Sequence, residues 1–215
     1  MTERDWQPLS AAVLAGGKSS RMGSDKALAS LTEGGPPLLQ LVLDAVRVVA
    51  DDILVIGDDR QIQTSFPFRT VPDVIPGAAA LGGIHAAVVT AKYEHCLVVA
   101  CDMPFLNGDL LEYMATRSRN YDVLIPVLSG ESRQRPDGLI YQTLHAIYSR
   151  SVVPAIEREI AAHRLKVIGF FSDVRVRTIG PETIGRLDPN LRSFFNANTP
   201  ETLALARRIA ADSGP

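Results

Sequence analysis

Glycines and basic residues gather in one short segment near the amino end of the chain, residues 14–26 (LAGGKSSRMGSDK). Glycines let a backbone approach a ligand closely and turn its N–H groups toward phosphate oxygens. The three cations suit the charge of a triphosphate and of a pyrophosphate leaving group. The alternative interpretation is a surface turn whose basic side chains are solvated. The glycines are Gly16, Gly17 and Gly23, and the cations are Lys18, Arg21 and Lys26.

A lone carboxylate follows the most apolar short segment of the chain. Asp102 comes two residues after the apolar residues 97–100 (LVVA), and Pro104 follows it. A single carboxylate at such a strand end suits Mg²⁺, which takes one or two carboxylates together with substrate phosphates. The alternative is a turn-forming aspartate ahead of a proline. Asp73 follows a weaker segment, residues 68–71, and joins the same crevice if both segments are strands of one parallel sheet.

Two amides stand close together near the carboxyl end of the chain, in residues 194–200 (FFNANTP). If this segment is a short strand, Asn196 and Asn198 lie on one face of it. Their donors and acceptors would then hydrogen-bond a substrate or orient a metal-bound water. The alternative gives Asn198 a role in the turn or cap before the last helix.

Short apolar segments alternate with helical patterns along the chain, which predicts an α/β fold with a largely parallel sheet. In such a sheet ligands bind beyond the carboxyl ends of the strands, so residues 14–26 and Asp102 should meet at one edge. Asn107 is a candidate cap for one helix, and Thr199 and Pro200 begin the last one. Strands are expected over residues 11–15, 53–56, 68–71, 97–100, 123–127 and 139–141, and helices over 38–49, 82–91, 107–117, 152–162 and 200–210.

Length and composition indicate one ordinary globular domain. The chain has 215 residues, of which 46% are hydrophobic and 21% charged, and its net charge is −2. That charge gives no support for binding to nucleic acid or to a membrane surface, where a basic excess is expected. The longest apolar run, residues 96–101, is far too short to span a membrane, and residues 1–7 lack the apolar stretch of a signal peptide. Two cysteines cannot form a disulfide scaffold, and we therefore expect a cytoplasmic protein.

The histidines and cysteines show no pattern typical of a metal site. Cys96 and Cys101 are expected on opposite faces of a buried strand, as small core residues. The histidines share no metal-ligand spacing and are expected in the core or in solvent. They are His85, His95, His145 and His163.

Three segments together resemble the signature sequences of the MobA-like nucleotidyltransferases: residues 14–26, residues 98–106 (VVACDMPFL) and residues 195–201 (FNANTPE). They occur in the family's order, and the resemblance extends over essentially the whole chain. It implies a three-layer, Rossmann-like fold of the type found in nucleotide-diphospho-sugar transferases, with a mostly parallel central sheet. It also implies transfer of GMP from GTP to the molybdopterin-bound molybdenum cofactor, with release of pyrophosphate and with Mg²⁺ as the enzyme's own cofactor.

The resemblance also implies roles for individual residues. Within a single domain, 1–215, residues 9–127 would bind the nucleotide and residues 128–215 the acceptor. Besides GTP and molybdopterin, a protein that delivers the finished cofactor to molybdoenzymes is an expected partner, whereas nucleic acid and membranes are not. The nucleotide would contact Leu14, Ala15, Gly16, Gly17, Lys26, Asp73 and Asp102; catalysis would depend on Lys26, Arg21 and Asp102; the metal would bind Asp102; and Asn196 and Asn198 would bind or support the acceptor.

The double glycine at Gly16 and Gly17 favours guanine, because guanylyl members of the family usually carry Ala-Gly-Gly where cytidylyl members carry Ala-Ala-Gly. A methyl group at position 16 would crowd a purine that approaches the backbone. Two positions depart from the family pattern: Gly57 stands where Asn is frequent, and residues 76–83 (PGAAALGG) lack the second proline of Pro-Gly-x-Gly-Pro-Leu-x-Gly. The alternatives are a cytidylyltransferase or another NTP transferase with a different phosphorylated acceptor, and a catalytically inert nucleotide-binding assembly protein.

Overall fold

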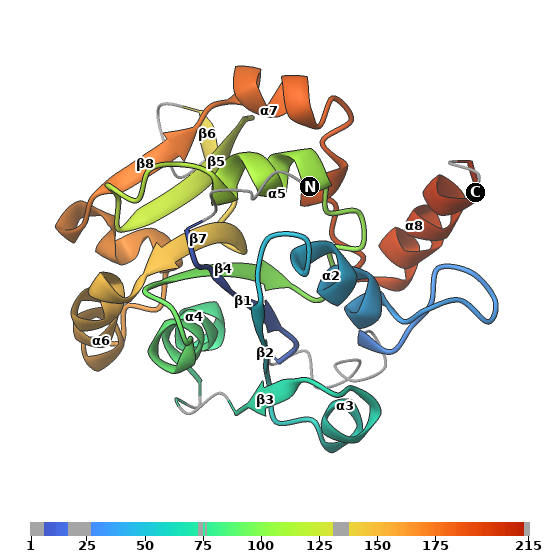
Figure 1. The fold of residues 1–215 in the computed structure, drawn as a ribbon, viewed down its shortest axis with the longest axis horizontal. Helices are drawn as coiled ribbons and strands as arrows, with labels where there is room; N and C mark the ends of the chain where they lie inside the picture. Colours follow the sequence, from blue (N-terminus) through green and yellow to red (C-terminus); the bar gives the residue numbers. More distant parts are fainter. Residues whose placement is uncertain (1–6, 17–26, 73–74, 76, 131–137, 213–215) are drawn as a thin grey trace.

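The computed structural model describes residues 7–16, 27–72, 75, 77–130 and 138–212. In this part of the chain one eight-stranded sheet runs through the molecule, in the order β3-β2-β1-β4-β7-β5-β6 with β8 beside β5 (Figure 1). The strands are β1 (Ser10–Leu14), β2 (Asp52–Ile56), β3 (Arg69–Val71), β4 (His95–Ala100), β5 (Val123–Ser129), β6 (Leu139–Tyr141), β7 (His145–Ser149) and β8 (Val176–Ile179).

Most of the strand pairs are parallel, which confirms the predicted type of sheet. β1 lies at the centre of the parallel part, with β2 on one side and β4 on the other, and β3 extends it beyond β2. β7 enters antiparallel between β4 and β5, and β6 is also antiparallel to β5. β8 restores a parallel pair with β5. The chain therefore fills its central sheet from both halves of the sequence.

Helices cover both faces of the sheet, and the alternating side chains of its central strands are accordingly buried on both faces (Figure 1). Val13 of β1 packs in a cluster with the apolar faces of α2, α5 and α7, whereas Leu14 packs with α4 and α6 on the opposite side. This is the expected three-layer arrangement. The helices are α2 (Leu38–Val46), α3 (Arg60–Ser65), α4 (Ala79–Thr90), α5 (Gly108–Ala115), α6 (Val153–Ala161), α7 (Pro181–Leu187) and α8 (Pro200–Asp212), with 3₁₀ turns η1 (Arg150–Val152), η2 (Val167–Asp173) and η3 (Arg192–Phe194).

The predicted elements are present with ends that differ by a few residues, and β7, β8, α3 and α7 are additions to them. Two predicted caps are confirmed. The Asn107 side chain accepts a hydrogen bond from the Leu110 N–H at 3.0 Å. Thr199 and Thr202 cap each other's backbone N–H groups at the start of α8, at 2.9 and 3.2 Å. Among the helices of the described residues, none combines the length and the apolar character needed to cross a membrane.

An ion pair at the amino end of β5 gives a prediction for acid stability. The buried Asp122 carboxylate accepts hydrogen bonds from the Arg175 backbone and side chain and from the Ser151 hydroxyl. These bonds, chiefly those from the Arg175 guanidinium, hold the pKa of Asp122 well below its usual range. Because the folded-state pKa is depressed, this stabilisation is complete above the unfolded pKa, about 3.9, and is lost as the pH falls below it.

Asp122→Asn is therefore expected to lower the free energy of unfolding by about 1–3 kcal/mol at pH 7, because it breaks buried charge-assisted hydrogen bonds. The difference from the wild type should shrink between about pH 5 and pH 2, because Asp122 of the unfolded wild-type chain takes up a proton there while the folded state still holds the carboxylate charged. Urea unfolding at pH 7, 4 and 3 measures this. Asp173→Asn, at an exposed ion pair with Arg158, is the control and should change stability little. An Asp122→Asn deficit that is the same at all three pH values would contradict the prediction.

Candidate active site at the carboxyl edge of the sheet

The carboxyl ends of β1 and β4 lie side by side at one edge of the sheet. Leu14, the last residue of β1, pairs with Ala100, the last residue of β4. Just beyond, the Cys101 N–H donates to the Leu14 carbonyl at 3.1 Å. The chain goes from β1 outward to β2 and later returns to the other side of β1 as β4, so the strand order reverses here. Such a reversal opens a ligand-binding crevice in α/β sheets.

The first loop leaves this edge through Leu14, Ala15 and Gly16. The Leu14 side chain is buried against α4, and Ala15 is also buried, with its N–H donating to the Ile56 carbonyl at 2.8 Å. Gly16 is exposed. Of the nucleotide-contact residues expected in this strand end, Leu14 and Ala15 thus have backbone groups engaged by the sheet, and Gly16 is the first residue open to a ligand.

Two glycines from neighbouring strands meet in this loop. A Cβ at Gly57 would lie 3.3 Å from the Ala15 carbonyl carbon and 3.4 Å from the Gly16 nitrogen, which is tighter than ordinary packing. Gly57 therefore lets the end of β2 approach the loop, a packing reason for a residue that departs from the family pattern. A Cβ at Gly16 would instead find ordinary contacts, 3.5 Å from the Gly57 Cα and 3.8 Å from the Ile56 carbonyl oxygen. The described residues leave room for a methyl group at position 16.

Asp102 lies two residues beyond the end of β4 at the same edge, where the C-terminal segment returns to meet it. The Ala197 N–H donates to the Asp102 carbonyl at 2.8 Å, and the rings of Phe105 and Phe195 pack edge to face with centroids 5.9 Å apart. The structure therefore brings three segments that are far apart in sequence, residues 14–16, 100–106 and 194–198, to one place.

The segment that carries the two predicted amides is not a strand, which corrects that expectation. It is joined to the strand end of β4 through the Ala197 N–H, and no ladder with β4 forms among the described residues. Burial nevertheless alternates as a strand would, since Ala197 is buried while Asn196 and Asn198 are exposed. The Asn196 amide donates to the Phe194 carbonyl at 3.2 Å. Both amides are thus accessible from solvent next to Asp102.

α4 also begins at this edge, because it connects the carboxyl end of β3 to the amino end of β4. Its first turn contains no acidic residue, so the positive end of the helix dipole favours anions near the crevice. Gly83 allows α4 to pack on β1, since a Cβ there would lie 3.0 Å from Leu14 Cδ1. Ala79 stands where the family pattern has its second glycine and has a left-handed φ of 51°. The departure noted in residues 76–83 thus falls at the start of this helix, and its left-handed first residue was not expected.

The donor set at this edge fits a magnesium ion that is bound by one protein carboxylate and by substrate phosphates. Among the described residues no group of three or more His, Cys, Asp or Glu side chains could hold a metal by itself. The three converging segments contain one charged residue, Asp102. One carboxylate with substrate phosphates and water is a common set for Mg²⁺. The segments contain no Lys or Arg, and the candidate cations Lys18, Arg21 and Lys26 lie outside the described residues, as do Gly17 and Asp73.

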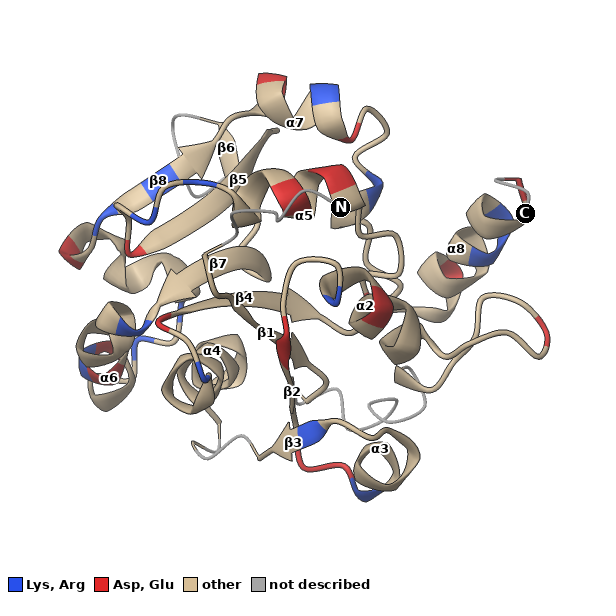
Figure 2. Cartoon of the chain, in the orientation of Figure 1, with Lys and Arg blue, Asp and Glu red and all other residues tan. Residues whose placement is uncertain are grey.

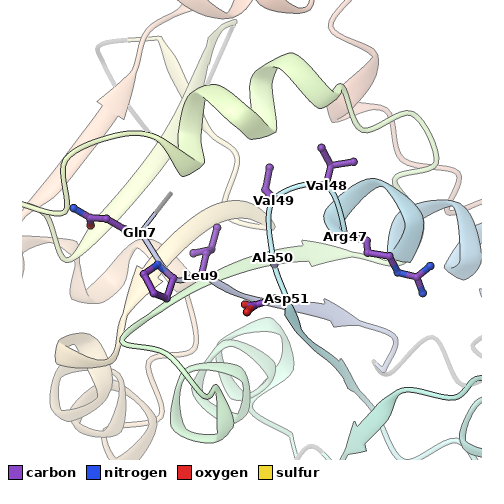
Figure 3. A pocket seen from close by; sticks show the side chains of 8 residues that line it. Gln7, Leu9, Arg47, Val48, Val49, Ala50 and Asp51 are labelled. Atoms are coloured by element: carbon purple, nitrogen blue, oxygen red, sulfur yellow. The ribbon is translucent and has the colours of Figure 1, made fainter. Parts of the chain in front are cut away.

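Two other surface features of the described residues give no competing candidate site. Figure 2 shows Lys and Arg interspersed with Asp and Glu over the outer helices α6 and α8. A hollow of about 290 Å³ lies between residues 7–9 and residues 47–51 (Figure 3). Because residues 7–9 precede β1 and Ala50 and Asp51 precede β2, this hollow is at the amino edge of the sheet, opposite Asp102.

Comparison with known proteins agrees with this geometry. The sequence pattern of the MobA-like NTP transferase domain matches residues 11–172. A probable molybdenum cofactor guanylyltransferase from Pelotomaculum thermopropionicum is 39% identical over 201 residues, which are 94% of this chain and 93% of the relative. A molybdenum cofactor guanylyltransferase from Desulfosudis oleivorans is 31% identical over 196 residues, 90% of this chain and 92% of the relative. The crystal structure of molybdopterin-guanine dinucleotide biosynthesis protein A from Archaeoglobus fulgidus superposes with a TM-score of 0.77 at 27% identity, over 94% of this chain and 99% of that one.

Proposed function

Because the chain belongs to the MobA-like NTP transferase family, we propose that it transfers GMP from GTP to the molybdopterin-bound molybdenum cofactor. The observation that carries the proposal is the meeting of Gly16 and Asp102 at the adjoining carboxyl ends of β1 and β4. A glycine loop and a lone carboxylate on either side of one crevice suit a bound nucleoside triphosphate. The names of the similar proteins support GTP and the molybdenum cofactor as substrates.

In the proposed reaction a terminal phosphate oxygen of molybdopterin attacks the α-phosphorus of GTP. A new P–O bond forms, the bond from the α-phosphorus to the oxygen that bridges to the β-phosphorus breaks, and pyrophosphate leaves with that electron pair. The protein needs no nucleophile of its own, so its task is alignment and charge stabilisation. Lys26 and Arg21 stabilise the charge on the leaving pyrophosphate.

Asp102 is the proposed magnesium ligand and Asp73 a further nucleotide contact. When bound, Mg²⁺ would neutralise phosphate charge and help to orient the α-phosphate. Asp102 lies just beyond the end of β4, and its backbone carbonyl accepts a hydrogen bond from the Ala197 N–H. Nucleotide binding is assigned to residues 9–127 and the acceptor to residues 128–215, with Asn196 and Asn198 next to the transferred group. Neither Cys96 nor Cys101 is in a disulfide, which suits the reducing cytoplasm as the site of the reaction.

We expect the wild-type protein to bind GTP more tightly than CTP or ATP by roughly five- to a hundredfold, because an unmatched buried polar group on a wrong base costs about 1–3 kcal/mol. Gly16→Ala should narrow the preference for GTP over CTP. The same change should leave the melting temperature unchanged, because its methyl group meets no described atom closer than 3.5 Å. Competitive nucleotide titration with Mg²⁺, together with thermal unfolding of both proteins, measures these effects.

Pyrophosphate release separates the rival functions. Release that requires GTP together with molybdopterin supports the proposal. Wild-type protein that binds CTP as tightly as GTP would indicate a cytidylyltransferase. Nucleotide binding without pyrophosphate release, with molybdopterin present, would indicate an inert nucleotide-binding assembly protein.

A further inference from the structure

We propose that Asp188 is a positioning residue: its buried carboxylate sets the turn that holds the Asn196–Asn198 segment against the strand end at Asp102. The inference rests on the proposed function for its kinetic part and on the geometry alone for its structural part. Asp188 ends α7 and is 4% exposed. Burial of a carboxylate is unfavourable unless it is hydrogen-bonded, so the hydrogen-bond partners of Asp188 indicate its structural role.

Both carboxylate oxygens of Asp188 accept backbone hydrogen bonds from the turn that follows. Oδ1 accepts from the Arg192 N–H at 3.1 Å and Oδ2 from the Ser193 N–H at 2.8 Å. The Asp188 carbonyl also accepts from the Leu191 N–H at 2.9 Å. One side chain therefore holds the first residues of η3 in place.

The same turn contains a backbone conformation that its sequence does not favour. Leu191 has a left-handed φ of 53°, a region that leucine rarely occupies, and the residue is 41% exposed. Strained residues of this kind persist where the surroundings over-determine them. The hydrogen bonds that Asp188 accepts from the N–H groups of Leu191, Arg192 and Ser193 supply that constraint.

The held turn is connected on two sides to the strand end. The buried Ser193 hydroxyl accepts a hydrogen bond from the Asn107 N–H at 2.9 Å, and Asn107 belongs to the chain that runs from Asp102 into α5. The ring of the next residue, Phe194, packs against the ring of the fully buried His145, with centroids 5.1 Å apart. His145 pairs with Val99 of β4.

These contacts form a continuous path from the carboxylate to the proposed metal ligand. After Ser193 and Phe194 the chain reaches Ala197, whose N–H donates to the Asp102 carbonyl. Burial lowers the pKa of His145 to about 4, so its ring is uncharged at neutral pH and does not neutralise Asp188. The backbone N–H groups of the turn therefore stabilise the Asp188 carboxylate by hydrogen bonding.

Asp188→Asn tests the proposal because an amide offers one oxygen to two N–H donors, so one of the two bonds is lost. We expect kcat for GMP transfer to fall about ten- to a hundredfold, the size of effect that a small misplacement of aligned groups produces. The KM for GTP should stay near that of the wild type, because the loop from Gly16 is not part of this path. Hydrogen exchange of the Ala197 amide should become faster, while exchange of the β1 and β4 amides stays slow.

Asp122→Asn is the matched control, because Asp122 is also a buried carboxylate that accepts backbone and side-chain bonds but lies at the amino edge. It should lower stability without changing kcat or the exchange of the Ala197 amide. Leu191→Gly in the Asp188→Asn background is the rescue, since glycine adopts a left-handed φ readily. It should restore part of the lost kcat and part of the Ala197 protection.

The exchange readout needs no substrate, so it separates this inference from the proposed function. Wild-type protein without GMP transfer would overturn the function and leave the Ala197 result standing. An Asp188→Asn protein with unchanged Ala197 exchange would overturn the positioning role. An equal loss of kcat in Asp122→Asn would also overturn it, because the loss would then follow stability alone.

Discussion

Asp102→Asn is expected to reduce GMP transfer on the order of a thousandfold or more, while the protein stays folded. The substitution is nearly isosteric, and the contact of Asp102 with Ala197 uses the backbone carbonyl, which the change does not touch. It removes the only charge in the three segments that meet at the crevice. Without that carboxylate the site loses its proposed magnesium ligand. The charge on the reacting phosphates then loses the preorganised stabilisation that the ion would supply.

Pyrophosphate release as a function of magnesium concentration measures the effect, with the melting temperature as the check on folding. Chelation of divalent ions should abolish wild-type activity and change the residual activity of the variant little. Asp109→Asn is the matched control, because Asp109 is an exposed acid in the first turn of the nearby helix α5. It should retain near wild-type activity. Undiminished pyrophosphate release by Asp102→Asn would remove Asp102 from the metal site.

The strands that bring the crevice together could be predicted from sequence because their signal is local. β1, β2 and β4 are short, apolar and closed by glycine or aspartate, and parallel strands share one carboxyl edge. The helix starts at Asn107 and Thr199 were predictable for the same reason, since a capping side chain acts within three residues of itself.

The elements that were not predicted are too short, or depend too much on long-range pairing, to show a hydrophobic repeat. β7 is five residues long, carries His145 and Ser149 at its ends, and is buried because it enters between β4 and β5. That pairing joins segments distant in sequence, which periodicity cannot reveal. α3 has six residues and one buried side chain, Ile62, too few for a helical repeat, although the Asp59 side chain caps its start. Tertiary context decides such segments.

Several features of the candidate site also depend on contacts that sequence alone does not contain. Gly57 appears in the sequence as a missing side chain, whereas the structure gives it a close approach to the Ala15–Gly16 peptide. Asp188 carries no motif, because its two donors are backbone groups. The left-handed conformation of Ala79 is equally invisible, since alanine favours ordinary helix. Motifs therefore indicate which segments meet, and packing determines how they are held.

Lys26→Ala is expected to lower kcat about a hundredfold or more, and by a larger factor than it raises the KM for GTP. Lys26 itself lies outside the described residues, but Ala27, the next residue, is fully buried in the core cluster on the α2 side of the sheet. The chain directly after residues 14–26 is therefore anchored in the core. If Lys26 stabilises charge that grows on the leaving pyrophosphate, its contact is stronger in the transition state than with bound GTP. The loss of such a contact lowers kcat more than it weakens GTP binding.

Steady-state kinetics on Lys26→Ala, Lys26→Arg and a control decide between catalysis and binding. Arginine should rescue only part of kcat, because its planar fork does not replace a compact ammonium group. Lys92→Ala is the control, since Lys92 is an exposed lysine just before the amino end of β4, and it should behave as wild type. An unchanged kcat with weakened GTP binding would make Lys26 an anchor for the nucleotide. If kcat and KM are both unchanged, residues 14–26 are better interpreted as a surface turn with solvated cations. Removal of a lysine that stabilises the leaving group must lower kcat.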